Sequence, residues 1–232
     1  MPENAGACNK KVAGVILAAG CGSRMGAVKQ LLPFENTTIL GRVVATARAS
    51  LLDDIVLVLG SEAGRVRCSL DRTYLDLPQP DMMYPDMTYS DLTYPDMTGI
   101  HVVENLDWHK GQAFSVAAGI KALPPETGGA LFLLGDQPLV MVQTINRLVS
   151  VFQTTDHWIV APCYNGQRGN PVLVAAPLFD RLIHPAGDAG ARVLFDEFRH
   201  RMHCLDVDDP GILRDVDTPE DYAALFRNRN SG

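Results

Sequence analysis

Short, continuous apolar segments alternate along this chain with segments whose apolar residues recur every three or four positions. Continuous apolar runs are typical of strands buried on both faces, whereas the second spacing places apolar residues on one side of a helix. Their alternation favours an α/β fold, and we predict a Rossmann-like three-layer α/β/α arrangement around a mostly parallel central sheet. The predicted strands are Val12–Leu17, Asp54–Gly60, Ile100–Glu104, Ala130–Leu134, Trp158–Pro162, Pro171–Ala175 and Met202–Val207, and the predicted helices are Ile39–Leu51, Ala113–Leu123, Val140–Phe152, Leu178–Leu182, Ala191–Phe198 and Thr218–Phe226.

We expect these elements to form a single domain over residues 12–227, behind a polar tail at residues 1–11. The last helix has a strong start signal, because Thr218 precedes Pro219 and two acidic residues follow in the first turn. A threonine cap, a proline in the first turn and acidic side chains at the positive end of the helix dipole all favour a helix here.

Residues 80–99 depart from the alternation of strands and helices. They contain a five-residue repeat in four copies, built on Pro-Asp-Met-Thr-Tyr. The repeat fits neither the helix period nor the strand period, and its prolines interrupt a helix. A loop this long in a compact domain is usually either functional or disordered. We favour a surface loop expanded by repetition with no role in the chemistry, and the alternative is a lid or partner-binding segment.

Charge and cysteine content exclude several classes of function. The net charge of −7 leaves no global basic surface for nucleic acid. No apolar run reaches the length of about 18 residues that crosses a membrane, and the polar N-terminus does not resemble a secretory signal. The five cysteines are far apart and form no Cys-x-x-Cys pair, so we predict neither a zinc site nor a disulfide framework. We expect a cytoplasmic protein that binds neither nucleic acid nor a membrane.

The first predicted strand is followed by a loop that contains three glycines and two cations. Gly20, Gly22 and Gly26 allow a turn in which backbone N–H groups gather, and such groups bind anions. Arg24 and Lys29 add two positive charges. Ligands of parallel sheets bind beyond the carboxyl ends of the strands, which is where this loop lies. The loop therefore predicts a site for a nucleoside triphosphate.

The spacing of the glycines differs from that of two common phosphate-binding motifs. The Walker motif requires Gly-Lys-Ser/Thr, whereas Ala27 follows Gly26 here. The dinucleotide motif requires a third glycine where Met25 stands. Two cations suit a triphosphate whose charge must be held during a reaction, and this argues against a dinucleotide-dependent oxidoreductase.

Six motifs occur in order along the chain: Leu17–Pro33, Val103–Val116, Leu134–Val140, Arg168–Val172, Gly187–Arg192 and Asp215–Tyr222. Together they resemble the signatures of MobA-like nucleotidyltransferases, and are most similar to the branch of molybdenum cofactor cytidylyltransferases. The resemblance covers residues 12–226 apart from the repeat, and it implies a sheet of the GT-A-like nucleotidyltransferase type.

The resemblance implies an enzyme that transfers CMP from CTP to the phosphate of molybdopterin cofactor and releases pyrophosphate. Such a reaction needs charge neutralisation and alignment more than a protein nucleophile. The implied substrates are CTP and molybdopterin, and a molybdoenzyme that receives the product is a plausible partner within this family. The alternatives are a guanylyltransferase for the same cofactor, a sugar- or alcohol-phosphate nucleotidyltransferase, and a non-catalytic nucleotide-binding or cofactor-chaperone protein.

Three residues are the implied catalytic groups. Arg24 would hold the β- and γ-phosphates, Lys29 would reach the α-phosphate, and Asp136 would bind Mg²⁺, with Mn²⁺ as an alternative metal. Asp217 is the expected second metal ligand, and Asp215 is a weaker candidate. Helix capping is the competing interpretation for Asp136, and stabilisation of the following helix is the one for Asp217.

The resemblance also implies residues that bind the nucleotide and the acceptor. A methyl group at Ala19 would narrow the base pocket and favour a pyrimidine. Related proteins more often have histidine at the position of Asn170, and the asparagine argues against an acid–base role there, because an amide does not titrate. The implied acceptor residues are Arg168, Asn170 and Asp188, and the implied nucleotide-binding residues are Leu17, Ala18, Ala19, Gly20, Gly22, Ser23, Arg24, Lys29, Gly111 and Ser115.

Overall fold

A computed structural model describes residues 10–22, 25–70, 93, 95–184 and 190–227, without the side chains of residues 190–193. Ser23, Arg24 and Asp188 lie outside the described residues, as does most of the repeat at 80–99. No helix within the described ranges has the length and apolar character needed to cross a bilayer.

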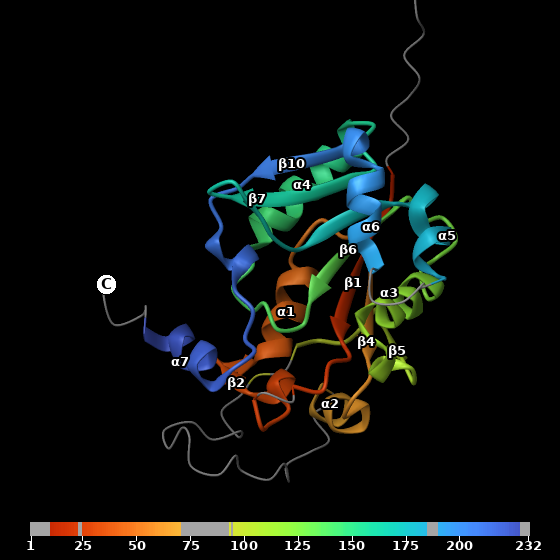
Figure 1. Ribbon diagram of the computed structural model, residues 1–232. Coiled ribbons are helices and arrows are strands. Elements are labelled where there is room, and N and C mark those ends of the chain that lie inside the picture. The colour runs from red at the N-terminus through yellow and green to blue at the C-terminus, as the bar shows by residue number, and fades with distance from the viewer. Residues whose placement is uncertain (1–9, 23–24, 71–92, 94, 185–189, 228–232) are drawn as a thin grey trace, which may run out of the picture.

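A twisted central sheet dominates the fold (Figure 1). Its strand order is β10-β7-β9-β6-β1-β4-β5, with β8 paired to β7. All strands run parallel except β9 and β8, which are antiparallel to their neighbours. The prediction of a mostly parallel sheet is therefore confirmed. The bounds are β1 Val12–Ala18, β4 Asp54–Leu59, β5 Ile100–Glu104, β6 Gly129–Leu134, β7 Ile159–Tyr164, β8 Gln167–Arg168, β9 Val172–Ala175 and β10 Met202–Asp206.

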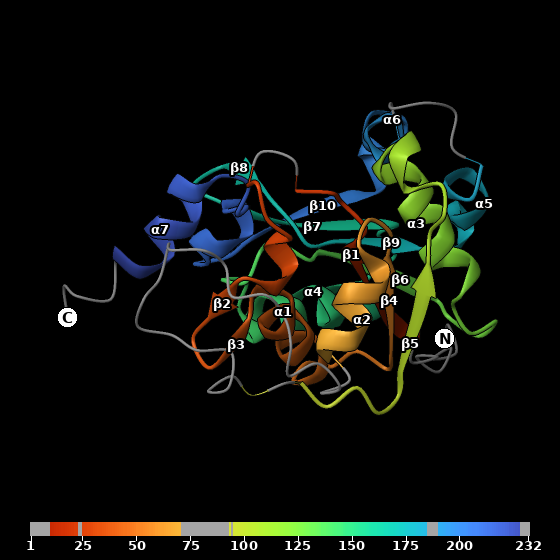
Figure 2. The ribbon, with the colours of Figure 1, turned by 90° about the horizontal axis from the view of Figure 1, so that it is seen from below.

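Helices cover both faces of this sheet (Figure 2). Alternate residues of β1 face opposite sides, so Ile16 packs with α1, α2 and α4, whereas Val15 packs with α3, α5 and α6. This two-sided burial is the reason why the strands are apolar throughout. The helices are α1 Ile39–Arg48, α2 Ala63–Leu70, α3 Gln112–Lys121, α4 Val142–Thr154, α5 Phe179–Leu182, α6 Gly190–Glu197 and α7 Pro219–Arg227, and the 3₁₀ turns named below are η1 Lys29–Leu31, η3 Trp108–Lys110 and η7 Pro210–Leu213.

Helix α2 was absent from the predicted elements. Its buried side chains include Ala63, Val66 and Leu70, which have helical spacing, but Gly64 and two arginines weaken the pattern within a segment of only eight residues. The start of α7 agrees with the prediction. Thr218 Oγ1 accepts from the backbone N–H of Asp221 at 3.2 Å, and an Asp221 oxygen accepts from the N–H of Thr218 at 2.9 Å.

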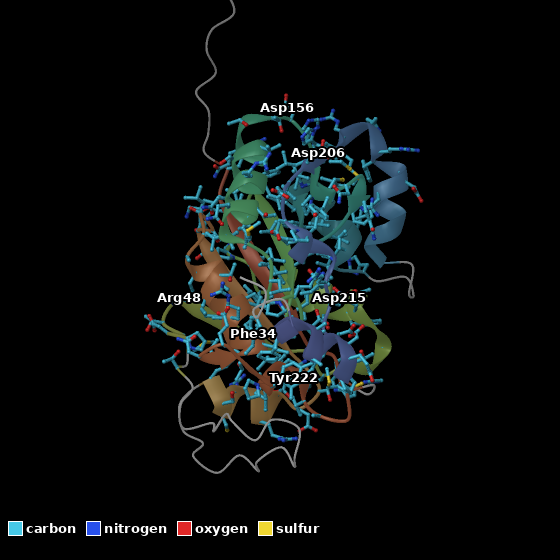
Figure 3. The ribbon with its side chains drawn as sticks, turned by 90° about the vertical axis from the view of Figure 1, so that its left-hand side faces the viewer. Phe34, Arg48, Asp156, Asp206, Asp215 and Tyr222 are labelled. Carbon is cyan, nitrogen blue, oxygen red and sulfur yellow. The ribbon has the colours of Figure 1, made fainter. Side chains whose placement is uncertain are left out.

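Besides the apolar clusters on the two faces of the sheet, another apolar cluster packs α7 against the segment that follows the glycine loop. Phe34, on the short strand β2 (Pro33–Phe34), packs with Tyr222, and its ring lies 6.1 Å from that of Phe226 (Figure 3). The hydroxyl of Tyr222 also donates to the carbonyl oxygen of Pro33. This packing brings Asp217, just before α7, close to Lys29 on η1.

Candidate active site

A cleft with a volume of about 200 Å³ lies at the carboxyl ends of β1 and β6. Five predicted nucleotide-binding residues line it, together with Asp136. Ala18, Gly22 and Gly111 are described but are not among its lining residues, and Ser23 and Arg24 are not described. The lining residues are Leu17, Ala19, Gly20, Lys29, Gln30, Trp108, Gln112, Ser115, Leu134, Gly135 and Asp136.

The glycine loop turns as the sequence predicts. Gly22 and Gly26 have φ angles of +57° and +67°, a region in which glycine is strongly favoured. The N–H of Met25 donates to the carbonyl oxygen of Gly22 at 2.9 Å and closes the turn. The chain then returns to the sheet, where η1 directs Lys29 toward the carboxyl end of β6.

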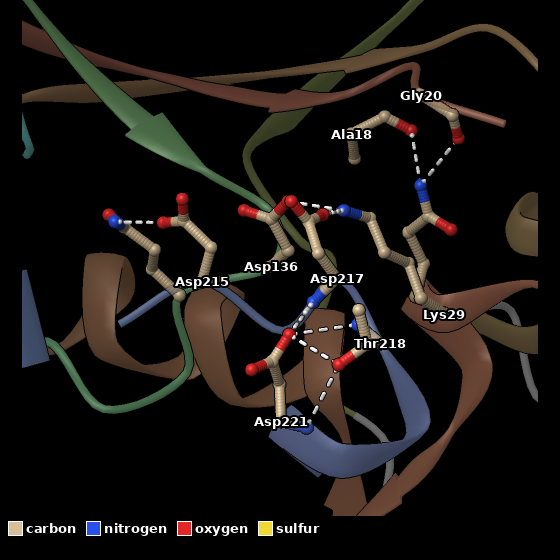
Figure 4. Close-up of polar contacts among 10 residues, drawn as sticks. Ala18, Gly20, Lys29, Asp136, Asp215, Asp217, Thr218 and Asp221 are labelled. Atoms are coloured by element: carbon tan, nitrogen blue, oxygen red, sulfur yellow. Dashed lines mark hydrogen bonds and ion pairs between the residues drawn. The ribbon is translucent and has the colours of Figure 1, made fainter. Parts of the chain in front are cut away.

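Lys29 joins two carboxylates that come from distant parts of the sequence (Figure 4). Its Nζ lies 2.5 Å from Asp136 Oδ2 and 2.7 Å from Asp217 Oδ1. Burial by itself lowers the pKa of the Lys29 ammonium, but Asp136 and Asp217 outweigh burial and raise that pKa above its ordinary value. Lys29 is therefore a fixed positive charge at neutral pH.

Hydrogen bonds join the loop after β6 to the segment before α7. The N–H of Val216 donates to the carbonyl oxygen of Asp136 at 3.0 Å. Gln137 Nε2 donates to Asp215 Oδ1 at 2.5 Å and to the carbonyl oxygen of Ile212 at 3.4 Å. These hydrogen bonds bring the carboxylates of Asp136 and Asp217 together at the Lys29 ammonium.

Asp209 is a buried carboxylate that supports this junction and was not predicted. Its Oδ2 accepts from the N–H of Met141 at 2.9 Å and from the hydroxyl of Thr144 at 2.7 Å, at the start of α4. Its Oδ1 accepts from the N–H of Gly211 at 2.9 Å, within η7. One side chain thus joins the start of α4 to the segment that leads to Asp217. The Asp209-Pro210 pair was a local turn signal, but its partners at 141 and 144 are visible only in the fold.

The carboxylates fit a divalent cation. Asp136 Oδ1 is buried and, among the described residues, accepts no hydrogen bond. Asp136 caps no helix, because α4 begins at Val142. Within the described residues no group of three or more His, Cys, Asp or Glu could hold a metal ion. The two carboxylates that contact Lys29, those of Asp136 and Asp217, would be the protein ligands of such a cation. This suits Mg²⁺ or Mn²⁺, since Mg²⁺ is commonly held by one or two carboxylates and completes its shell with phosphate oxygens and water.

The Asp215 side chain points away from Lys29 and toward Gln137 (Figure 4). Burial raises the pKa of the Asp215 carboxyl, the hydrogen bond from Gln137 opposes that rise, and the charges of Asp136 and Asp217 add to it. The hydrogen bond from Gln137 holds the Asp215 side chain in place, and this contact favours Asp217 as the second metal ligand.

The opposite wall of the cleft is made by residues near the start of α3. Ser115 Oγ accepts from Asn105 Nδ2 at 3.0 Å, so its own hydrogen is directed elsewhere. Trp108 on η3 approaches the glycine loop closely: a Cβ at Gly60 would lie 2.6 Å from the Trp108 Cβ and 2.7 Å from the Ala19 Cβ. Gly60 is therefore needed for this approach, a role that no local pattern revealed.

The described acceptor candidates lie at the same edge of the sheet but not in the cleft wall. Strand β9 is antiparallel to β6, with Val172 opposite Phe132, so Asn170 precedes β9 near the carboxyl end of β6. Arg168 is exposed on β8, and its guanidinium lies 4.3 Å from the centre of the Phe195 ring. The acceptor role of Arg168, Asn170 and Asp188 stays a prediction.

A mostly parallel sheet with a glycine loop at its carboxyl edge makes this an α/β protein, and solved nucleotidyltransferase structures have the same fold. Residues 14–203 match the MobA-like NTP transferase domain, and the chain belongs to that family. The family acts on nucleoside triphosphates, and the membership supports transferase activity.

Three proteins that are similar to this chain carry names that describe different functions. The chain is 30% identical to the purine catabolism protein PucB of Bacillus subtilis (strain 168), over 92% of this chain and 95% of PucB. It is 28% identical to the nicotine blue oxidoreductase of Paenarthrobacter nicotinovorans, over 93% and 96% of the two chains. It is 25% identical to the molybdenum cofactor cytidylyltransferase of Escherichia coli (strain K12), over 90% and 92%.

Solved structures agree with the fold. Rv0371c from Mycobacterium tuberculosis H37Rv is 29% identical and superposes with a TM-score of 0.71, over 94% of this chain and 98% of that one. A second structure of Rv0371c is a complex with manganese, with a TM-score of 0.65, 29% identity and coverage of 93% and 97%. A relative of this chain thus binds manganese.

Proposed function

We propose that this protein transfers CMP from CTP to the phosphate of molybdopterin cofactor and releases pyrophosphate. The observation that carries the proposal is Lys29 between Asp136 and Asp217 in a cleft beside the glycine loop. The cytidylyltransferase relative supports the choice of substrates. Ala19 lines the cleft, and an alanine in this position favours the smaller pyrimidine base.

In the proposed reaction, an oxygen of the acceptor phosphate bonds to the α-phosphorus while the bond from that phosphorus to the bridging oxygen breaks. The leaving pyrophosphate carries away the electron pair. Lys29 supplies a fixed ammonium for the charge that develops on the α-phosphate oxygens, and the glycine loop supplies backbone N–H groups. Asp136 and Asp217 would hold Mg²⁺ or Mn²⁺, which neutralises triphosphate charge when bound.

The test is pyrophosphate release with CTP, GTP, ATP or UTP, each with molybdopterin cofactor and Mg²⁺. The expected result is fastest release with CTP. Equal or faster release with GTP would replace the cytidylyl assignment by the guanylyl alternative. A parallel series with sugar phosphates and alcohol phosphates identifies the acceptor, and faster release there would move the assignment to that class.

The oxidoreductase relative makes redox chemistry the competing class. The glycine spacing and the buried ammonium favour a triphosphate over a dinucleotide. Consumption of NADH or NADPH by the purified protein, with no pyrophosphate release from any of the four nucleotides, would reverse this choice.

A further inference from the structure

Gln30, next to Lys29 on η1, is buried in the wall of the cleft and holds the glycine loop. Only 2% of the residue is exposed. Its Nε2 donates to the carbonyl oxygen of Ala18 at 3.2 Å and to that of Gly20 at 3.0 Å (Figure 4). Both hydrogens of this amide are therefore used on the loop.

The carbonyl between these two also has a protein partner. The N–H of Ser61 donates to the carbonyl oxygen of Ala19 at 3.1 Å. Three successive carbonyls of the loop thus accept hydrogen bonds from the protein, two of them from a single side chain. A ligand in the cleft meets these three carbonyls already engaged by the protein.

The two ends of the Gln30 amide differ in how well the described residues satisfy them. Gln30 Oε1 is buried and, in the described part of the chain, accepts no hydrogen bond. A buried amide oxygen without a donor is unfavourable, and this penalty offsets part of what the two hydrogen bonds to Ala18 and Gly20 contribute to stability. The glutamine is accounted for by the two carbonyls that it orients.

We infer that Gln30 is a positioning residue that sets the base preference of the cleft. It turns the carbonyls of Ala18 and Gly20 toward itself, so that the loop offers mainly backbone N–H donors to a nucleotide. On its pairing edge cytosine presents N3 and O2 as acceptors beside the N4 amino donor, whereas guanine presents N1–H and the N2 amino group as donors beside the O6 acceptor, so guanine gains more from free carbonyls. The inference rests on the proposed function, because it takes the cleft as the nucleotide site.

The test compares Gln30→Met and Gln30→Glu with Gln153→Met. Gln153 is a matched control, since its Nε2 also donates to a backbone carbonyl, that of Lys10 at 3.1 Å, outside the cleft wall. Calorimetry measures the Kd of CTP and of GTP with Mn²⁺ and without acceptor, and steady-state assays measure kcat and KM. We expect both Gln30 variants to raise the Kd and KM of CTP about tenfold, with kcat within about threefold of wild type.

The readout specific to the inference is the ratio of the GTP Kd to the CTP Kd. It should fall about fivefold in the Gln30 variants, because freed carbonyls accept from guanine, and stay constant in Gln153→Met. A ratio within about twofold of wild type in both Gln30 variants would overturn the inference. Calorimetric stoichiometry counts folded sites, so partial unfolding lowers the number of sites and leaves the ratio measurable.

The two proposals fail separately. If wild type binds nucleotides with this dependence on Gln30 but releases no pyrophosphate, the transfer proposal fails and the positioning role stands. If wild type transfers CMP while the ratio is insensitive to Gln30, the positioning role fails and the transfer proposal stands.

Discussion

The backbone N–H of Val216 donates to the carbonyl oxygen of Asp136 at a distance of 3.0 Å. This bond fixes Val216 to Asp136. Because Asp217 follows Val216 directly, it holds together the two residues whose carboxylates contact Lys29. The spacing of the two carboxylates is therefore set by the backbone and not by long, mobile side chains. A site fixed in this way loses little freedom when a ligand binds.

Lys29→Met should strengthen metal binding in the absence of nucleotide while weakening catalysis. The Lys29 ammonium lies between the two carboxylates, where it competes with a cation for their charge. We expect the Kd for Mn²⁺ to fall about tenfold and kcat to fall by about 10² or more. Electron paramagnetic resonance of free Mn²⁺ measures the first and pyrophosphate release the second.

Lys11→Met is the control for this variant, since Lys11 pairs with Glu126 at an exposed site 3.1 Å away and should leave both quantities unchanged. Weaker or unchanged Mn²⁺ binding by Lys29→Met would contradict the competition between the ammonium and the metal.

Asp136→Asn should remove metal-dependent turnover and leave the fold intact. The amide keeps the size of the side chain but not the charge, and Lys29 retains Asp217 as a partner. We expect the rate of pyrophosphate release to fall by a factor of about 10² or more, while the circular dichroism spectrum stays unchanged. Asp156→Asn, at an exposed position, controls for loss of a surface charge. Near-normal rates would remove Asp136 from the proposed metal site.

Asp209→Ala should destabilise the protein. The change leaves the N–H groups of Met141 and Gly211 and the hydroxyl of Thr144 without their acceptor in a buried setting. We expect a loss of about 3 kcal/mol in the free energy of unfolding, measured in urea. Asp156→Ala is the control. If both variants unfold at the same urea concentration, Asp209 does not secure the junction.

Asp221 should make stability depend on pH. The hydrogen bond from the Thr218 side chain, opposed by slight burial and assisted by the backbone N–H groups of Asp217 and Thr218, holds the pKa of Asp221 below its ordinary value of 3.8. A lowered folded-state pKa adds stability above pH 3.8 that is lost as the pH falls through the folded value.

Asp221→Asn should therefore cost about 1 kcal/mol at pH 7, as loss of a helix cap does, and progressively less below pH 3.8. Urea unfolding of both proteins at a series of pH values measures the difference. A difference that is constant from pH 7 to pH 3 would show that the charge of Asp221 is not responsible.

Local pattern predicted most of this fold, because buried parallel strands leave an unbroken apolar signal. The bounds of the predicted strand Ile100–Glu104 agree with β5, and those of Val12–Leu17 differ from β1 by one residue. Helix α2 was not predicted because its apolar face contains few residues and because Gly64 interrupts the helical pattern.

The site was predictable only in part. Lys29, Asp136 and Asp217 were expected to act together, and the fold brings them together. Gln30 and Gly60 were missed because their roles depend on partners that distant segments supply.

The origin of Asp217 has a consequence for protein synthesis. Lys29 and Asp136 belong to segments that leave the ribosome early, whereas Asp217 follows the final strand of the sheet. A nascent chain that has already assembled its glycine loop still lacks half of the carboxylate pair. Competence for the proposed chemistry is thus delayed until the segment before α7 docks beside β2.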